Sequence, residues 1–214
     1  MEKNTHIELD KVLPADIEAR SFEIIRSELP HPVPEELAPV IIRAIHTTAD
    51  FEYADSLCFS EGVMGIARTA LKSGATIVTD TNMALAGINN GALEKLGCRK
   101  ICFMADMDVA AAARANGFTR AAASVDKAAS IVGPLIYAVG NAPTALIRLY
   151  EKISNGEMMP DLVIGVPVGF VNVVQAKELI MTAGVPYIVA RGRKGGSNVA
   201  AAIINALMYT ITRN

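Results

Sequence analysis

The stretch "PLIYAVGNAPTAL", residues 134–146, contains the unit from which the fold is built. Its first half is a continuous apolar run, which is typical of a β-strand covered on both faces. Its second half has the residues of a helix start. Asn141 is suited to cap the helix, and Pro143 fits the first turn, where no backbone N–H is needed. The stretch therefore predicts a buried strand that leads directly into a helix.

The same unit, a short apolar run followed by a turn and a helical stretch, occurs four more times between residue 75 and the end of the chain. The further runs are "ATIVTD" (75–80), "KICFMAD" (100–106), "LVIGVPV" (162–168) and "PYIVARG" (186–192). The segments between them are long enough for crossover helices, which connect parallel strands. We therefore expect a five-stranded parallel sheet in a three-layer α/β domain.

The segment of about 15–72 is predicted to be mostly helical. Its helices are expected near 15–29, 35–49 and 60–72. The motif "PHPVP" (30–34) is a connector, because each proline disfavours helix at the residue before it. His31 within it is expected to be an exposed loop residue, and His6 lies in a polar N-terminal tail. Together with a sheet-forming part of about 73–214, this segment is expected to form a single domain, 1–214.

Composition excludes several classes of protein. A net charge of -2 and a pI near 5.9 argue against a nucleic-acid partner. No apolar run is long enough to cross a membrane, and no signal peptide is recognisable. Hydrophobic residues make up 51% but aromatic residues only 5%, which indicates tightly packed helices or a buried subunit contact. The cysteines, Cys58, Cys98 and Cys102, form no CxxC pair and are expected to be reduced thiols of a cytoplasmic protein.

Candidate binding residues follow the strands. In an open parallel sheet, ligands bind beyond the carboxyl ends of the strands, where loops meet helix N-termini. The loop "ARGRKGGSN" (190–198) places three cations and two adjacent glycines before a helix expected near Ser197. This composition favours a carboxylate or phosphate ligand, although the cations also fit a solvated face. There is no GxxxxGK[ST] motif and no GxGxxG after the first strand, so ATP and NAD are not indicated.

Arg43 and His46 are candidates for chemistry, because a spacing of three places them on one face of a helix. A guanidinium there would hold an anionic substrate against an imidazole that moves protons near neutral pH. A purely structural His46, beside solvated acidic neighbours, is the alternative that these residues leave open. No GxSxG, HExxH or cysteine–histidine set occurs, so a proton-assisted rearrangement fits better than hydrolysis.

Seven motifs occur in order between about residues 14 and 209. They are "RSFEIIRSE" (20–28), "RAIH" (43–46), "TDTNM" (79–83), "TRAAA" (119–123), "GNAPTAL" (140–146), "GVPVGFV" (165–171) and "RGRKGGS" (191–197). Together they closely resemble the precorrin-8X methylmutase family of corrinoid biosynthesis. The resemblance implies a flavodoxin-like domain, a homodimer, and an isomerase that needs no cofactor. It also implies the reaction: a methyl group of the macrocycle moves from C11 to C12, giving hydrogenobyrinate, or cobyrinate when cobalt is already inserted.

The resemblance also implies roles for single residues. His46 in "RAIH" matches the proton donor or acceptor of the family, and Ser21 and Arg43 match substrate-binding positions. Loop position and substrate charge extend the binding set to Asn82, Arg120, Asn141, Arg191, Gly195 and Ser197. Met83 and Phe170 are expected to supply apolar walls. No metal-ligand spacing is present, so cobalt would arrive inside the substrate.

Two other functions stay open at this point. The first is a corrinoid-binding module without catalysis, although the DxHxxG segment of cobalamin-binding modules is missing around His31. The second is an enzyme that acts on a small phosphorylated or carboxylated metabolite through "RGRKGGS".

Overall fold

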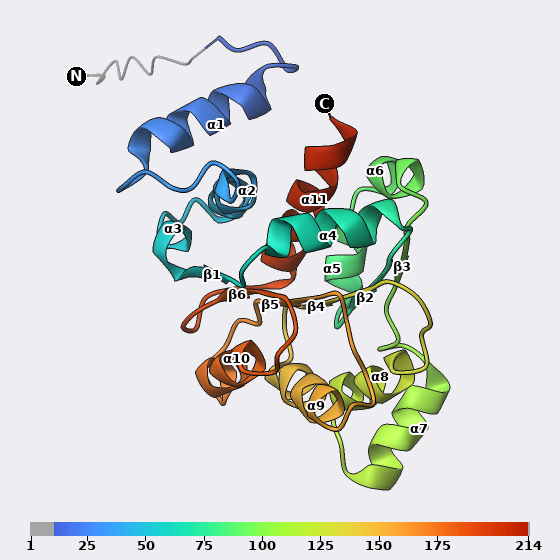
Figure 1. Cartoon of the computed structure of the whole chain (residues 1–214). Coiled ribbons are helices and arrows are strands. Elements are labelled where there is room, and N and C mark those ends of the chain that lie inside the picture. The colour runs from blue at the N-terminus through green and yellow to red at the C-terminus, as the bar shows by residue number, and fades with distance from the viewer. Residues whose placement is uncertain (1–10, 214) are drawn as a thin grey trace, which may run out of the picture.

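The computed structural model describes residues 11–213, which form a six-stranded sheet covered by helices on both faces (Figure 1). Across the sheet the strands are ordered β1-β6-β5-β4-β2-β3. Their bounds are Leu57–Phe59 (β1), Thr76–Thr79 (β2), Arg99–Ile101 (β3), Leu135–Val139 (β4), Leu162–Gly165 (β5) and Tyr187–Ala190 (β6). Strands β2 to β6 are parallel, and each lies within one of the predicted apolar runs or starts one residue before it.

The prediction of five strands is wrong by one, because β1 adds an antiparallel edge beside β6. In the register of this pair Leu57 lies opposite Ala190. β1 is three residues long and directly follows the short helix α3 (Tyr53–Ser56), without a Gly or Pro between them. A segment this short has neither the alternation nor the apolar run by which strands are predicted. The segment 15–72 is therefore mostly but not wholly helical.

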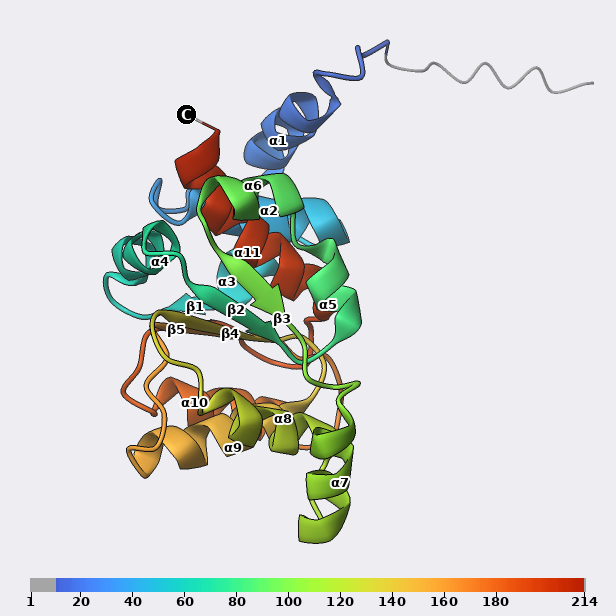
Figure 2. The same cartoon turned by 90° about the vertical axis from the view of Figure 1, so that its right-hand side faces the viewer.

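The helices form two layers. The layer above the sheet contains α2 (Ala38–Thr48), α4 (Val63–Lys72), α5 (Asn82–Gly87), α6 (Asn90–Lys95) and α11 (Ser197–Thr212). The layer below it contains α7 (Met107–Asn116), α8 (Arg120–Ala128), α9 (Pro143–Ser154) and α10 (Val173–Met181). Both views show this division, and both show α1 (Ile17–Glu28) on the outside of α2, away from the sheet (Figures 1 and 2).

Helix α11 is the centre of the upper layer and is buried around most of its circumference. A helix that is apolar on nearly all sides is typical of a position between other elements. Small residues allow close approach: a Cβ added to Gly87 would lie 2.8 Å from the Cβ of Ala201. The low aromatic content is thus explained in part by tightly packed helices, as predicted.

The three helices predicted before the first parallel strand are present as α1, α2 and α4, with ends that differ by up to three residues. The motif "PHPVP" connects α1 to α2, as predicted. His31 within it is exposed, and its Nε2 lies 2.7 Å from Oδ1 of Asp55. His6 lies outside the described residues. Within residues 11–213 no helix is long and apolar enough to cross a membrane.

The order in which strands are added to the sheet reverses at β2. From β2 the chain passes to β3 on one side, and then β4 returns to pair with the other side of β2. The loops after β2 and β4 therefore diverge at their carboxyl ends. In open α/β sheets the crevice at such a switch point is the usual place for a ligand.

Candidate active site

A buried carboxylate organises the switch point. Asp80, directly after β2, is 1% exposed and accepts three backbone N–H groups from the loop after β4. The donors are Gly140 N at 2.8 Å, Asn141 N at 2.8 Å and Ala142 N at 2.7 Å. Burial raises the pKa of Asp80, and these three donors oppose the rise.

The prediction that Asn141 caps α9 is wrong. Ala142 holds the N-cap position without a side-chain bond, and Asp80 accepts the N–H groups of the three residues that precede the helix. Pro143 begins the helix, as predicted. The carboxylate of Asp80 therefore fixes the loop that leads from β4 into α9.

The start of α11 is held against the same loops. Ser197 Oγ lies 2.7 Å from Oγ1 of Thr81, whose hydroxyl also caps α5 by accepting the N–H of Ala84. A Cβ added to Gly140 would lie 2.7 Å from the Cα of Ser197, so only glycine allows this approach. The predicted site residue Ser197 is therefore held at the switch point by its contacts with Thr81 and Gly140.

The glycine loop, residues 191–196, lies beyond β6. Gly195 has φ +157, and a Cβ there would meet the carbonyl oxygen of Val166 at 2.1 Å. Gly196 donates its N–H to the same carbonyl at 2.8 Å. Lys177 of α10 donates to the loop from below, with Nζ 2.9 Å from Gly192 O and 2.8 Å from Lys194 O. The loop is thus packed tightly against β5 and α10.

The three cations of this loop have different partners. Arg191 pairs with Glu178 of α10 at 3.0 Å. Lys194 pairs with Asp50 and Glu52, just after α2, so these two acids are not merely solvated. Arg193 is exposed, and its guanidinium lies 5.5 Å from the ring centroid of Phe170. Arg193 takes part in none of the ion pairs among residues 11–213, which leaves its charge available to a ligand.

The side chain of His46 lines a groove between α2, α5 and α11. The groove has a volume of about 230 Å³ and is lined by Arg43, His46, Thr47, Gly87, Asn198, Ala201, Ala202 and Asn205. The imidazole is exposed and meets the Phe22 ring edge to face at 5.3 Å between centroids. Arg43 and His46 therefore share one groove, as their helical spacing predicts.

Arg43 is not free in this structure. Its Nη1 donates to Oε1 of Glu18 at 3.1 Å, and Glu18 also binds Arg213. Burial raises the pKa of Glu18, but hydrogen bonds and charges from both arginines outweigh this and lower it. The Arg43 guanidinium also lies 5.0 Å from the Phe22 ring centroid and 4.8 Å from that of Tyr209. An incoming carboxylate would therefore compete with Glu18 for this arginine.

Three other predicted site residues do not line the groove. Asn82 is exposed at the first position of α5, next to Thr81. Arg120 is exposed at the start of α8, where Thr119 Oγ1 lies 2.8 Å from Oγ1 of Thr144. Ser21 on α1 donates its hydroxyl to the carbonyl of Ile17 at 2.8 Å.

The apolar residues predicted as walls are exposed. Met83 is 72% and Phe170 is 81% exposed, and Val168 and Val171 flank Phe170 on the loop after β5. These residues follow β2 and β5, at the same edge as the polar groups of the switch point. Exposed apolar side chains at this edge, with the Arg193 guanidinium beside Phe170, suit a ligand with an apolar body and anionic arms.

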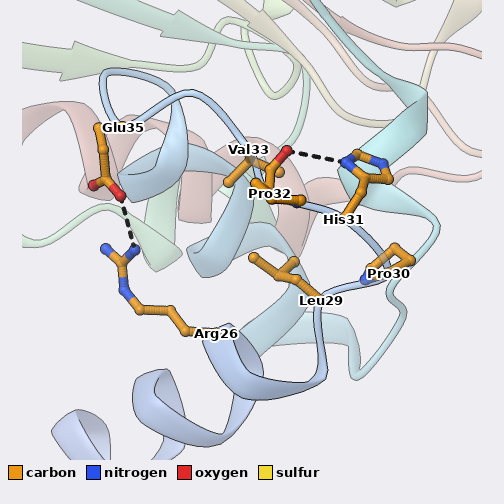
Figure 3. Close-up of a pocket in the computed structure, with 7 residues that line it drawn as sticks. All are labelled: Arg26, Leu29, Pro30, His31, Pro32, Val33 and Glu35. Carbon is orange, nitrogen blue, oxygen red and sulfur yellow. Dashed lines mark hydrogen bonds and ion pairs between the residues drawn. The ribbon is translucent and has the colours of Figure 1, made fainter.

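A more voluminous pocket, about 400 Å³, lies elsewhere. It is formed by the connector between α1 and α2, and Figure 3 shows its lining, with an Arg26–Glu35 ion pair on one side and His31 on the other. None of the predicted site residues lines it. Separately, no cluster of three or more His, Cys, Asp or Glu side chains suited to a metal ion occurs between residues 11 and 213.

Sequence reasoning missed three residues that shape the site: Asp80, Lys177 and Glu18. A signal existed for two of them. Asp80 follows a fully buried strand, and Lys177 lies on the apolar stripe of α10 that also carries Val173, Ala176 and Ile180. No sequence signal marks Glu18, because its ion pair with Arg43 joins two different helices, α1 and α2.

The amino-acid sequence is similar to those of known proteins over most of its length. A family model described as precorrin-8X methylmutase matches residues 16–210. The cobalt-precorrin-8 methylmutase of Priestia megaterium is 42% identical over 92% of this chain and 88% of its own length. The precorrin-8X methylmutase of Pseudomonas aeruginosa is 38% identical over 88% of this chain and 91% of its own.

A solved structure agrees with these relatives. The precorrin-8X methylmutase from Thermus thermophilus superposes with a TM-score of 0.85 at 40% identity, covering 92% of this chain and 98% of that one. Sequence and backbone therefore match over nearly the whole chain. The chain belongs to the precorrin-8X methylmutase family.

Proposed function

We propose that the chain is an isomerase of cobalamin biosynthesis. It moves the methyl group at C11 of precorrin-8X, or of its cobalt complex, to C12 and so forms hydrogenobyrinate or cobyrinate. The observation that carries the proposal is the groove in which exposed His46 lies beside Arg43, at the edge where α11 begins. Membership of the methylmutase family supports the reaction type.

The substrate is a broad apolar ring fringed by carboxylates, and the carboxyl edge suits such a shape. β2 and β6 are separated by β5 and β4, so their ends lie about 14 Å apart at the usual strand spacing. A macrocycle reaches both ends, whereas a small phosphorylated metabolite does not. This separation favours the macrocycle over the small metabolite.

His46 is the proton donor or acceptor in this proposal. A methyl shift around the ring needs the π system polarised and the product tautomer captured, and one imidazole at the ring edge does both by transferring a proton. The edge-to-face contact with Phe22 holds the imidazole in place while leaving it exposed to the groove. General acid or base catalysis of this kind contributes about 10²- to 10⁴-fold.

The remaining proposed residues bind the fringe of carboxylates. Arg43 is closest to the imidazole, and it would exchange Glu18 for a substrate carboxylate. The other binding residues of the proposal are Ser21, Asn82, Arg120, Asn141, Arg191, Gly195 and Ser197. Among them Arg191 is paired with Glu178, so Arg193, which is exposed beside Phe170, is an additional candidate from the same loop. No cofactor of the protein's own is needed.

We also propose the assembly and setting of the enzyme. The topology is flavodoxin-like, since the parallel strands numbered among themselves run 2-1-3-4-5. The working unit is a homodimer, because the groove alone is too small for a macrocycle and Ile17 and Leu13, near α1, are more than half exposed. The free thiols Cys58, Cys98 and Cys102 suit the cytoplasm.

Turnover tests the proposal against a corrinoid-binding module without catalysis. Purified protein is incubated anaerobically with a large excess of precorrin-8X or of cobalt-precorrin-8, and the absorption spectrum is followed. The proposal expects product in many-fold excess over the protein with at least one of these substrates. A spectral shift that stops at one equivalent, with no new compound after extraction, would make the chain a binding module instead.

A further inference from the structure

Lys177 is a fully buried lysine whose charge has no carboxylate partner. It lies on the apolar stripe of α10, is 0% exposed, and takes part in none of the ion pairs found between residues 11 and 213. Its Nζ donates to two acceptors only, the carbonyl oxygens of Gly192 and Lys194. Burial lowers its pKa to about 8. A buried ammonium is costly, so a placement of this kind needs a reason.

The two carbonyl bonds fix the direction of two N–H groups. A trans peptide is planar, with its C=O and N–H pointing in opposite directions, and no cis peptide occurs in the described chain. Because Gly192 O and Lys194 O point toward Lys177, the N–H groups of Arg193 and Gly195 point away from it. Neither N–H donates to a protein acceptor within residues 11–213.

The outer side of the loop therefore has the chemistry of a carboxylate site. It carries two backbone N–H donors and the exposed guanidinium of Arg193, which lies over Phe170. Backbone N–H groups that point to one side form anion-binding concavities, and a guanidinium adds a charge-assisted bond. Phe170 places apolar surface beside these donors, as a ring with carboxylate arms requires.

We propose that Lys177 is a positioning residue for substrate binding. It holds residues 192–195 so that the N–H groups of Arg193 and Gly195 bind one peripheral carboxylate of the macrocycle. This inference rests on the proposed function for the identity of the ligand. Lys177 itself does not touch the substrate and acts only through the two peptides that it holds.

The test compares three variants of the full-length enzyme. In Lys177→Met the two carbonyls lose their donor, so we expect KM for the precursor to rise about tenfold or more while kcat changes less than threefold. Lys177→Arg keeps donors at the same place and should recover most of the affinity. Lys72→Met, on the exposed end of α4, is the matched control and should behave as wild type. If Lys177→Met does not fold, Lys177→Gln replaces it, because its amide ends one bond short of the lysine Nζ and loses the two carbonyl bonds, and the same rise in KM is expected.

A second readout separates this inference from the proposed function. In ¹⁵N NMR titrations with hydrogenobyrinate, the amides of Arg193 and Gly195 should shift in wild type and not in Lys177→Met. If wild type binds with these shifts but turns over no precursor, the proposed function fails and the role of Lys177 stands. An unchanged KM in Lys177→Met, a fall in kcat alone, or no amide shifts in wild type would overturn the inference.

Discussion

Replacing Asp80 by asparagine should destabilise the protein substantially, because one isosteric amide cannot accept all three of the backbone N–H groups that Asp80 accepts. Its single oxygen can keep the bonds to Asn141 and Ala142, which both reach Oδ2. The amide nitrogen then faces the N–H of Gly140, donor against donor, inside a buried site. The change is small in volume and large in hydrogen bonding.

The magnitude follows from these contacts. An unsatisfied buried donor costs about 1–3 kcal/mol, and two hydrogen bonds that lose their charge weaken by roughly 0.5–1 kcal/mol each. Removal of the buried charge returns part of this cost. We expect a net loss of about 2–4 kcal/mol in the free energy of unfolding, which for a chain of this length lowers Tm by roughly 4–16 °C.

Urea unfolding followed by circular dichroism, at one fixed protein concentration, measures this loss. Asp161→Asn is the matched control, since Asp161 accepts a single N–H, from Leu135, which an amide oxygen can also accept. Its loss should stay below about 1.5 kcal/mol. An Asp80→Asn variant within about 0.5 kcal/mol of wild type, or an equal loss in Asp161→Asn, would show that the three N–H bonds of Asp80 do not stabilise the fold in this way.

The hydrogen bond to Asp55 raises the pKa of His31. The stabilisation that this contact gives the folded protein is therefore present at acidic pH and is lost as the pH rises through the pKa of His31. An NMR titration of Asp55→Asn should give a lower pKa for His31, and an unchanged pKa would contradict the contact. In steady-state assays Glu18→Gln should lower KM two- to fivefold and Arg43→Gln should raise KM about tenfold, because Glu18 competes with the substrate carboxylate for Arg43. A rise in KM for both variants would exclude this competition. Relative to Lys177→Met, wild type should gain stability by about 1.4 kcal/mol per pH unit between about pH 8 and about pH 10, because the pKa of Lys177, about 8 in the folded protein, lies below that of the unfolded chain. A stability difference that does not depend on pH in urea unfolding would show that Lys177 is not buried as a titrating group.

Features encoded by local pattern were predictable from the sequence. The five parallel strands are continuous apolar runs because both of their faces are covered, and the spacing of Arg43 and His46 places them in one groove. The three-residue strand β1 was not predictable, since it exists only through its pairing with β6, which lies about 130 residues further along the chain.

Features that depend on tertiary contact escaped prediction. The local rule for helix starts favoured Asn141 as a cap, but Asp80, 60 or more residues earlier, accepts the backbone N–H groups of Gly140 and Asn141 and so fixes this loop from outside the helix. The RGRKGG cations were expected to face one ligand, whereas Arg191 and Lys194 meet acids of α10 and of the turn after α2. No sequence period marks such contacts, because each joins separate elements.

In the proposed mechanism His46 transfers the proton during the methyl shift. Single-turnover conversion of saturating precursor by His46→Asn tests this role, with His31→Asn as a control because His31 lies in a separate pocket. We expect a rate constant reduced about 10²- to 10⁴-fold for His46→Asn, with hydrogenobyrinate still bound, and an unchanged rate for His31→Asn. Conversion by His46→Asn within tenfold of wild type would show that His46 does not transfer this proton.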